Sequence, residues 1–150
     1  MHIWIDADAC PKSIKEILFR AAKRTQINTT LVSNQWLSAP PSPYIHTLRV
    51  AGGFDVADNK IVELMQAGDI VITADIPLAD AVVTKGGIAL NPRGEIYHED
   101  NIKLRLAVRN MSTELRDSGL ISSSSPKLGT RELTAFANQL DRLLAKKGRG

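Results

Sequence analysis

The sequence contains a single cysteine, Cys10, among 150 residues. One thiol cannot form an intramolecular disulfide, and it leaves no group of cysteines to hold a zinc ion. Histidines are also scarce, and the three that occur, at positions 2, 46 and 98, show no spacing typical of metal ligands or of a catalytic triad. We therefore expect a protein of a reducing compartment, in which Cys10 is a small buried thiol and not a nucleophile.

Long apolar runs are absent as well. No stretch approaches the roughly 20 residues that cross a bilayer, and the first strand-like residues lead into acids where a signal peptide would have an apolar core. A content of 43% hydrophobic and 23% charged residues is ordinary for a globular domain. We expect one cytoplasmic domain that does not associate with membranes. The net charge of +3 allows a nucleic-acid partner without requiring one, and the oligomeric state stays open.

The most informative stretch is a short apolar run that ends in two carboxylates. Residues 3–5 predict a buried strand, and Asp6 and Asp8 follow it directly. Pro11 suits the first turn of a helix, so both acids fall at the carboxyl edge of a strand, where α/β sheets bind ligands. A divalent cation between the acids would relieve their repulsion. The structural alternative is that Asp8 caps the helix and Asp6 hydrogen-bonds a turn.

The rest of the chain alternates predicted strands and helices. This order is typical of a three-layer α/β domain with a mostly parallel central sheet and helices on both faces. Residues 1–98 would then hold the sheet and the acidic site, and a serine-rich segment would join the C-terminal helices 99–118 and 130–147. The predicted strands are 29–32, 44–50, 69–73 and 88–90, and the other predicted helices are 12–24, about 55–66 and one that starts near Pro77.

A second acid follows the most apolar strand. Residues 69–73 contain three consecutive branched apolar side chains, and Asp75 and Pro77 come directly after them, which repeats the arrangement of the opening. Two neighbouring parallel strands would bring Asp6 and Asp75 to one edge of the sheet. A helix cap is the alternative role for Asp75, although capping does not explain why acids gather after apolar strands.

Two further acids lie on predicted helices. Asp58 falls in the first turn of helix 55–66, at the margin of its apolar stripe, and could join the same edge of the sheet. The alternative for Asp58 is a structural one, since a helix dipole favours negative charge in the first turn. Asp80 is a weaker candidate, because a solvated helix face accounts for it as well.

Polar and basic side chains offer candidates for substrate binding. Asn34 lies near the carboxyl end of strand 29–32, on the edge where the acids are expected. Arg93, in a predicted turn, could hold a phosphate or orient a carboxylate, and an exposed turn arginine is the alternative. Arg105 and Arg109 lie beside the apolar stripe of helix 99–118. They are weak candidates, because basic side chains in this position are usually exposed to solvent and bind nothing.

Four motifs stand out in the sequence. They are Asp-Ala-Asp-Ala-Cys-Pro at 6–11, Val-Ala-Gly-Gly-Phe-Asp-Val-Ala-Asp at 50–58, Thr-Ala-Asp-Ile-Pro-Leu-Ala at 73–79 and Asn-Pro-Arg-Gly at 91–94. In their order and spacing, these motifs resemble the YaiI/YqxD family of bacterial proteins over essentially the whole chain. That family is similar to the PIN-like nucleases, whose α/β sheet gathers acids around one or two Mg²⁺ or Mn²⁺ ions to hydrolyse RNA.

The resemblance assigns roles to individual residues. It makes Asp6 the central metal ligand, Asp75 and Asp58 further catalytic ligands, and Asp8 a fourth ligand. Thr73 would occupy the polar position two residues before Asp75, whereas Asp80 matches a PIN-like acid only loosely. The expected reaction is phosphodiester hydrolysis in RNA, assisted by Mg²⁺ or Mn²⁺ ions that polarise a phosphoryl oxygen and activate water.

Two other functions fit part of the pattern. A haloacid dehalogenase-type phosphatase also has Asp-x-Asp after an apolar strand, and Asp6 would then be its nucleophile. Against this alternative, no lysine begins a helix after Thr73, and no paired acids follow a later strand. The other alternative is a non-catalytic PIN-like module that binds RNA, because a fold can keep its scaffold and lose its chemistry.

Overall fold

The computed structural model describes residues 1–7, 10–35, 39–52, 56–97, 102 and 129–148. Apart from Ile102, the predicted helix 99–118 lies outside these residues, and so does the serine-rich segment. So do Asp8, Arg105 and Arg109, whose predicted roles stay predictions. Within the described ranges, no helix combines the length and the apolarity that a membrane span needs.

The centre of the domain is a sheet of five parallel strands in the order β3-β2-β1-β4-β5. The prediction of a mostly parallel sheet is confirmed, and each predicted strand is present within a residue or two of its expected bounds. The strands are β1 (Ile3–Asp6), β2 (Thr29–Ser33), β3 (Ile45–Arg49), β4 (Ile70–Ile72) and β5 (Ile88–Leu90).

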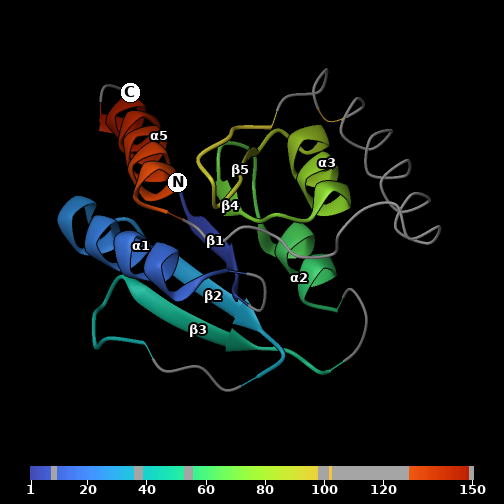
Figure 1. The fold of residues 1–150 in the computed structure, drawn as a ribbon. Coiled ribbons are helices and arrows are strands. Elements are labelled where there is room, and N and C mark those ends of the chain that lie inside the picture. The colour runs from blue at the N-terminus through green and yellow to red at the C-terminus, as the bar shows by residue number, and fades with distance from the viewer. Residues whose placement is uncertain (8–9, 36–38, 53–55, 98–101, 103–128, 149–150) are drawn as a thin grey trace, which may run out of the picture.

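Helices cover both faces of this sheet, as Figure 1 shows. On one face, α1 and α5 contact each other, and their apolar side chains share one core cluster; α2 and α3 form a second cluster on the other face. The three-layer α/β architecture expected from the sequence is therefore confirmed. The helices are α1 (Lys12–Thr25), α2 (Val56–Leu64), α3 (Ile76–Thr84) and α5 (Thr130–Gly148).

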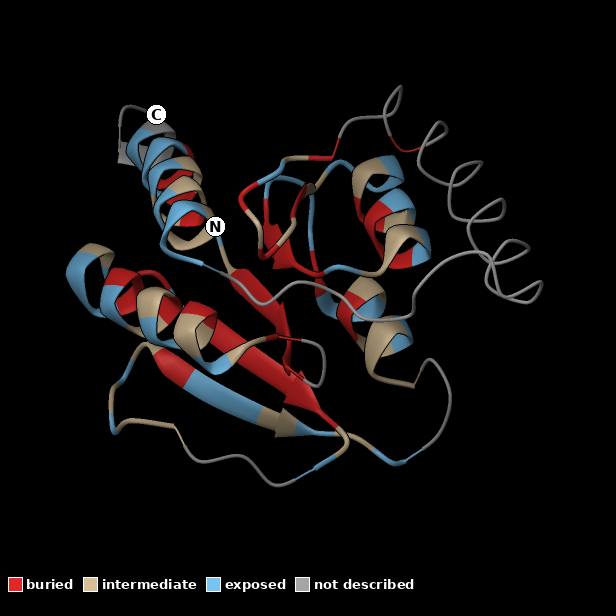
Figure 2. Cartoon of the chain, viewed as in Figure 1, coloured by how far each residue is buried: buried red, intermediate tan, exposed pale blue. Residues whose placement is uncertain are grey.

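Burial follows the position of each strand in the sheet. All residues of β1, β2 and β4 are buried, whereas β3, at an edge, exposes three of its five residues (Figure 2). Because successive side chains point to opposite faces, Ile3 and Ile5 pack into the α1–α5 cluster and Trp4 packs into the α2–α3 cluster. The same alternation directs Asp6 to the face that α2 and α3 cover.

The place of one proline and the end of one helix differ from expectation. Pro11 precedes α1, at its N-cap position, with φ −61° and ψ 149°, and does not lie within its first turn. Proline has no N–H to leave without a partner there, so the residue suits the boundary as well as the turn. Helix α2 ends at Leu64, four residues before Gly68, whose φ of +91° belongs to the following turn.

The Asn-Pro-Arg-Gly turn docks the last helix. Gly94 has φ +94°, and a Cβ at this position would lie 2.7 Å from the backbone of both Ala135 and Phe136 in α5. The turn is held by Asn91, whose Oδ1 accepts from the Arg93 N–H at 2.7 Å and whose Nδ2 donates to the Tyr97 hydroxyl at 2.7 Å. Glycine is therefore needed at position 94 for both conformation and close packing.

Candidate functional site

The candidate site lies where the strand order reverses. From β1 the chain adds β2 and then β3 on one side, and it returns to add β4 and β5 on the other side. In doubly wound parallel sheets, ligands bind at the carboxyl ends of the two strands that flank such a reversal. Here those strands are β1, which ends in Asp6, and β4, which Thr73 follows.

Asp6 and Thr73 are adjacent because of the strand register. Ile5 pairs with Ile72, so the next residue of each strand falls side by side at the carboxyl edge. Both side chains are buried, with 6% of Asp6 and 1% of Thr73 exposed. The Thr73 hydroxyl donates to Asp6 Oδ2 at 3.1 Å and accepts from the Asp75 N–H at 3.0 Å. One threonine thus fixes a buried carboxylate and the loop that leads into α3.

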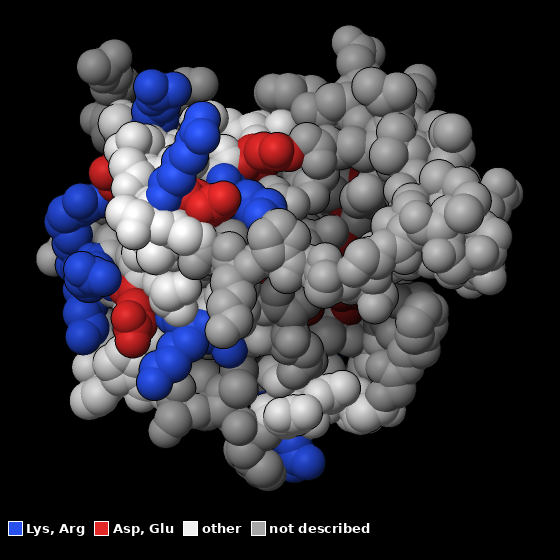
Figure 3. Space-filling view, in the orientation of Figure 1, with Lys and Arg blue, Asp and Glu red and all other residues white. Residues whose placement is uncertain are grey.

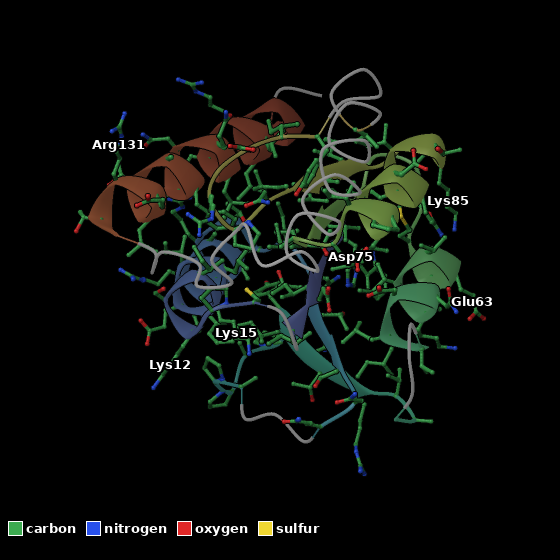
Figure 4. All side chains as sticks on the ribbon, turned by 45° about the vertical axis from the view of Figure 1, so that its right-hand side comes forward. Lys12, Lys15, Glu63, Asp75, Lys85 and Arg131 are labelled. Carbon is green, nitrogen blue, oxygen red and sulfur yellow. The ribbon has the colours of Figure 1, made fainter. Side chains whose placement is uncertain are left out.

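Asp75 is the N-cap of α3. Its φ and ψ are −81° and 116°, and its Oδ1 accepts from the Leu78 N–H at 2.9 Å, so the capping alternative is confirmed. Figure 4 labels Asp75 at the N-terminal end of this helix. The expectation that β1 and β4 are neighbours and bring Asp6 and Asp75 to one edge is also confirmed, through the Thr73 hydroxyl that both residues contact.

The other candidate residues take separate positions. Asp58 is half-buried in the first turn of α2, a helix that packs against β1 and β2, and Asn34 is half-buried directly after β2. Asp80 is exposed on α3, as a solvated helix face requires, and Arg93 is half-buried in the turn after β5. Asp6 and Thr73 are two candidate residues whose side chains contact each other directly.

The described carboxylates do not form a ready-made metal centre. No group of three histidine, cysteine, aspartate or glutamate side chains within the described ranges is placed to hold an ion together. Mg²⁺, however, keeps several waters and binds through one or two carboxylates together with substrate phosphates. A buried Asp6 carboxylate at the edge where ligands bind fits that kind of site, and its sequence neighbour Asp8 stays the predicted second ligand.

Cys10 lies in the same region. The side chain is 9% exposed, and burial raises the pKa of its thiol to about 12; the charge of Asp6 adds to this increase, and that of Lys15 opposes it. Because the thiolate is the reactive form, Cys10 stays a neutral thiol at physiological pH. The interpretation of Cys10 as a small buried side chain is confirmed.

A polar network that the sequence analysis did not predict lies at the amino ends of the two central strands. The carboxylate of Asp69, 7% exposed, accepts from the His2 N–H at 3.0 Å, the Trp4 Nε1–H at 3.1 Å and the Gln66 N–H at 2.9 Å. The His2 ring stacks on Trp4 with centroids 4.1 Å apart and hydrogen-bonds Thr30 Oγ1 at 2.7 Å. The one signal for this network in the sequence was an acid directly before the most apolar strand.

Burial lowers the pKa of His2, the neighbouring His46 and the N-terminal amine act in the same direction, and the charge of Asp69 opposes them. The neutral form of His2 is therefore favoured in the folded protein. This network joins the first residues of β1 to the residue before β4, so its role is to hold the two central strands together at their amino ends.

The five-stranded order and the buried carboxylate at its reversal define a Rossmann-like α/β domain with a candidate ligand site at the β1–β4 edge. A family model described as "Uncharacterized BCR, YaiI/YqxD family" matches residues 4–146. The chain therefore belongs to the YaiI/YqxD family, as its motifs indicate.

Relatives match nearly the whole length of the chain. It is 55% identical over 146 residues to a UPF0178 protein of Maridesulfovibrio salexigens, with 97% of each chain covered. It is 58% identical over 146 residues to a UPF0178 protein of Shewanella amazonensis, with 97% of this chain and 98% of the relative covered. A third UPF0178 protein, of Thioalkalivibrio sulfidiphilus, is 58% identical over 147 residues, with 98% and 100% covered. No solved structure matches the chain significantly.

Proposed function

We propose that the protein is a Mg²⁺- or Mn²⁺-dependent nuclease that hydrolyses phosphodiester bonds in RNA at the β1–β4 edge. The observation that carries the proposal is the buried Asp6 carboxylate, held by the Thr73 hydroxyl at 3.1 Å where the strand order reverses. Burying a carboxylate costs free energy, and at this edge of the sheet the Asp6 carboxylate would serve as a ligand for a hard cation. The resemblance of the surrounding motifs to PIN-like nucleases supports the same reaction.

The residues of the chain would divide the work as follows. Asp6, together with Asp8, would bind the ion, and the Thr73 hydroxyl would keep the Asp6 carboxylate in one orientation. Arg93, half-buried in the turn after β5, would neutralise phosphate charge. A bound Mg²⁺ or Mn²⁺ would supply a polarised phosphoryl oxygen and a water of lowered pKa.

The first test is calorimetric titration of Mn²⁺ and Mg²⁺ into the metal-free protein, into Asp6→Asn and into Glu16→Gln. Glu16 is exposed on α1, so the matched control removes one negative charge away from the site. We expect binding in the micromolar to low-millimolar range, loss of it in Asp6→Asn and its retention in Glu16→Gln. Equal binding by Asp6→Asn would contradict the proposal.

The second test is cleavage of a fluorescently labelled single-stranded RNA in Mn²⁺, with EDTA and Asp6→Asn as controls. We expect products with the unmodified protein alone. RNA that binds at low salt without any product would instead indicate a non-catalytic module. Hydrolysis of p-nitrophenyl phosphate, with a beryllium fluoride adduct that Asp6→Asn cannot form, would indicate the phosphatase.

A further inference from the structure

A groove separates the two helices that share one face of the sheet. It has a volume of about 420 Å³ and is lined by Ile17, Arg20, Ala21 and Arg24 of α1 and by Ala137 and Asp141 of α5. The α1 residues follow the spacing of a single helix face. The groove therefore has an apolar floor, two guanidinium groups and one carboxylate, and its volume falls within the roughly 300–1,000 Å³ of small-molecule sites.

One side of the groove is formed by a strongly basic helix, α1. Residues 12–25 contain five lysines and arginines and one acid, which gives +4, although the whole chain has a net charge of only +3. Figure 3 shows blue side chains gathered over α1 and α5. A local excess of positive charge of this kind attracts anions and raises their concentration at the surface.

The two arginines of the groove differ in their partners. Arg24 forms an ion pair with Asp141. This ion pair links the two helices and orients the Arg24 guanidinium. Arg20 lies one helical turn earlier, and no carboxylate in the described part of the chain forms an ion pair with it. An arginine presents several N–H groups in a planar fork that matches the oxygens of a phosphate. Arg20 is thus available to an external anion.

We propose that the α1–α5 groove binds a mononucleotide. The guanidinium of Arg20, assisted by Arg24, would hold the phosphate, and the flat base would lie on the apolar floor of Ile17, Ala21 and Ala137. Asp141 would accept hydrogen bonds from the sugar hydroxyl groups. A longer single strand of RNA is the less suitable occupant, because strand-binding surfaces stack successive bases on aromatic side chains, and no aromatic residue is among the described residues that line this groove.

This site is separate from the candidate metal site. The described residues that line it belong to α1 and α5, whereas Asp6 and Thr73 lie at the carboxyl edge of β1 and β4. Mononucleotide binding therefore does not depend on nuclease activity. The variant Asp6→Asn, which tests the nuclease, should bind mononucleotides as well as the unmodified protein does.

The experiment is calorimetric titration of adenosine 5′-monophosphate, adenosine and inorganic phosphate into the full chain, in metal-free buffer. The variants are Arg20→Gln, which removes the proposed phosphate contact, and Lys23→Gln, which removes the same charge from an exposed position of α1 outside the groove. We expect the monophosphate to bind more tightly than adenosine or phosphate alone. Arg20→Gln should weaken it by about tenfold or more, the value of one charge-assisted hydrogen bond, and Lys23→Gln should leave it nearly unchanged.

Three results would overturn the proposal. The first is no binding of the monophosphate up to about 10 mM. The second is an equal loss in Arg20→Gln and Lys23→Gln, which would show a diffuse attraction of charge and no site. The third is binding of a short RNA, weakened by Arg20→Gln, without binding of the monophosphate. Circular dichroism of both variants would verify that α1 is still folded.

Discussion

The hydrogen bonds of Thr73 allow a sharp prediction about the candidate site. The variant Thr73→Val has nearly the same shape but no hydroxyl, so it removes the donor to Asp6 Oδ2 and the acceptor of the Asp75 N–H together. The Asp6 carboxylate and the Asp75 N–H remain in the variant without this partner, and Asp6 is only 6% exposed. We expect the variant to fold less stably and to hold Asp6 in a less defined orientation.

The size of the effect follows from the two contacts. A hydrogen bond to a charged group contributes about 1.5–3 kcal/mol, and one between neutral groups contributes about 0.5–1.5 kcal/mol. The free energy of unfolding should therefore fall by about 2–4 kcal/mol in Thr73→Val. For a domain of this length, that change corresponds to a decrease in Tm of roughly 5–15 °C.

The measurement is urea unfolding followed by tryptophan fluorescence, with Thr73→Ser as the matched control. Serine keeps the hydroxyl and loses one methyl group, so it should retain most of the stability that valine loses. The m-values of the two variants should agree, because the surface exposed on unfolding hardly changes. Metal titration of both variants then separates orientation from stability, since Thr73→Ser should bind Mn²⁺ more tightly than Thr73→Val.

Two results would refute the reasoning. If Thr73→Val were as stable as Thr73→Ser, the hydroxyl would not contribute the two hydrogen bonds assigned to it. If the stability fell as expected while Mn²⁺ binding stayed equal in both variants, Thr73 would be a structural residue that does not orient a metal ligand.

The remaining predictions concern other parts of the domain. As the pH falls from about 7.5 to about 5.5, the unmodified protein should lose more stability than His2→Gln. The reason is that burial lowers the pKa of His2 below 6.5, so the unfolded chain takes up the proton first. Equal losses in parallel urea titrations would contradict this prediction. A thiol reagent at about pH 8 should label Cys10 only after unfolding, given a pKa of about 12, and rapid labelling of the native protein would count against that assignment. Gly94→Ala should lower the free energy of unfolding by about 2–5 kcal/mol through its φ of +94° and its contact with α5. Gly52→Ala, with open space around it, is the control and should change it by less than about 1 kcal/mol.

Local patterns were sufficient to predict most of the architecture. Apolar runs of three to five residues predicted the strands, and helical spacing predicted α1 and α5, because burial on a sheet imposes these periods directly on the sequence. The position of Asp6 at the carboxyl end of β1 followed in the same way. The order of the strands did not, since each strand could pair with several others at no local cost.

Side-chain contacts between distant residues were beyond the sequence. The hydrogen bond from Thr73 to Asp6 and the role of Gly94 in docking α5 both depend on neighbours that the local pattern does not reveal. The helical pattern of α1 alone does not indicate a binding role for Arg20 and Arg24. The groove that they line forms only when α5, more than 100 residues later in the chain, packs beside α1.

The network at the amino edge explains how the site at the carboxyl edge is positioned. Asp69 binds the His2 N–H and the Trp4 indole, and it directly precedes β4, so it fixes the register in which Ile3 pairs with Ile70. A slip of one residue would turn every side chain of β1 to the other face of the sheet. Asp6 would then point toward α1 and lose the Thr73 hydroxyl. The buried Asp69 carboxylate, beside the amino end of β1, therefore determines where the Asp6 carboxylate lies at the carboxyl end. A variant such as Asp69→Ala should disturb the candidate site although residue 69 does not contact Asp6 or Thr73.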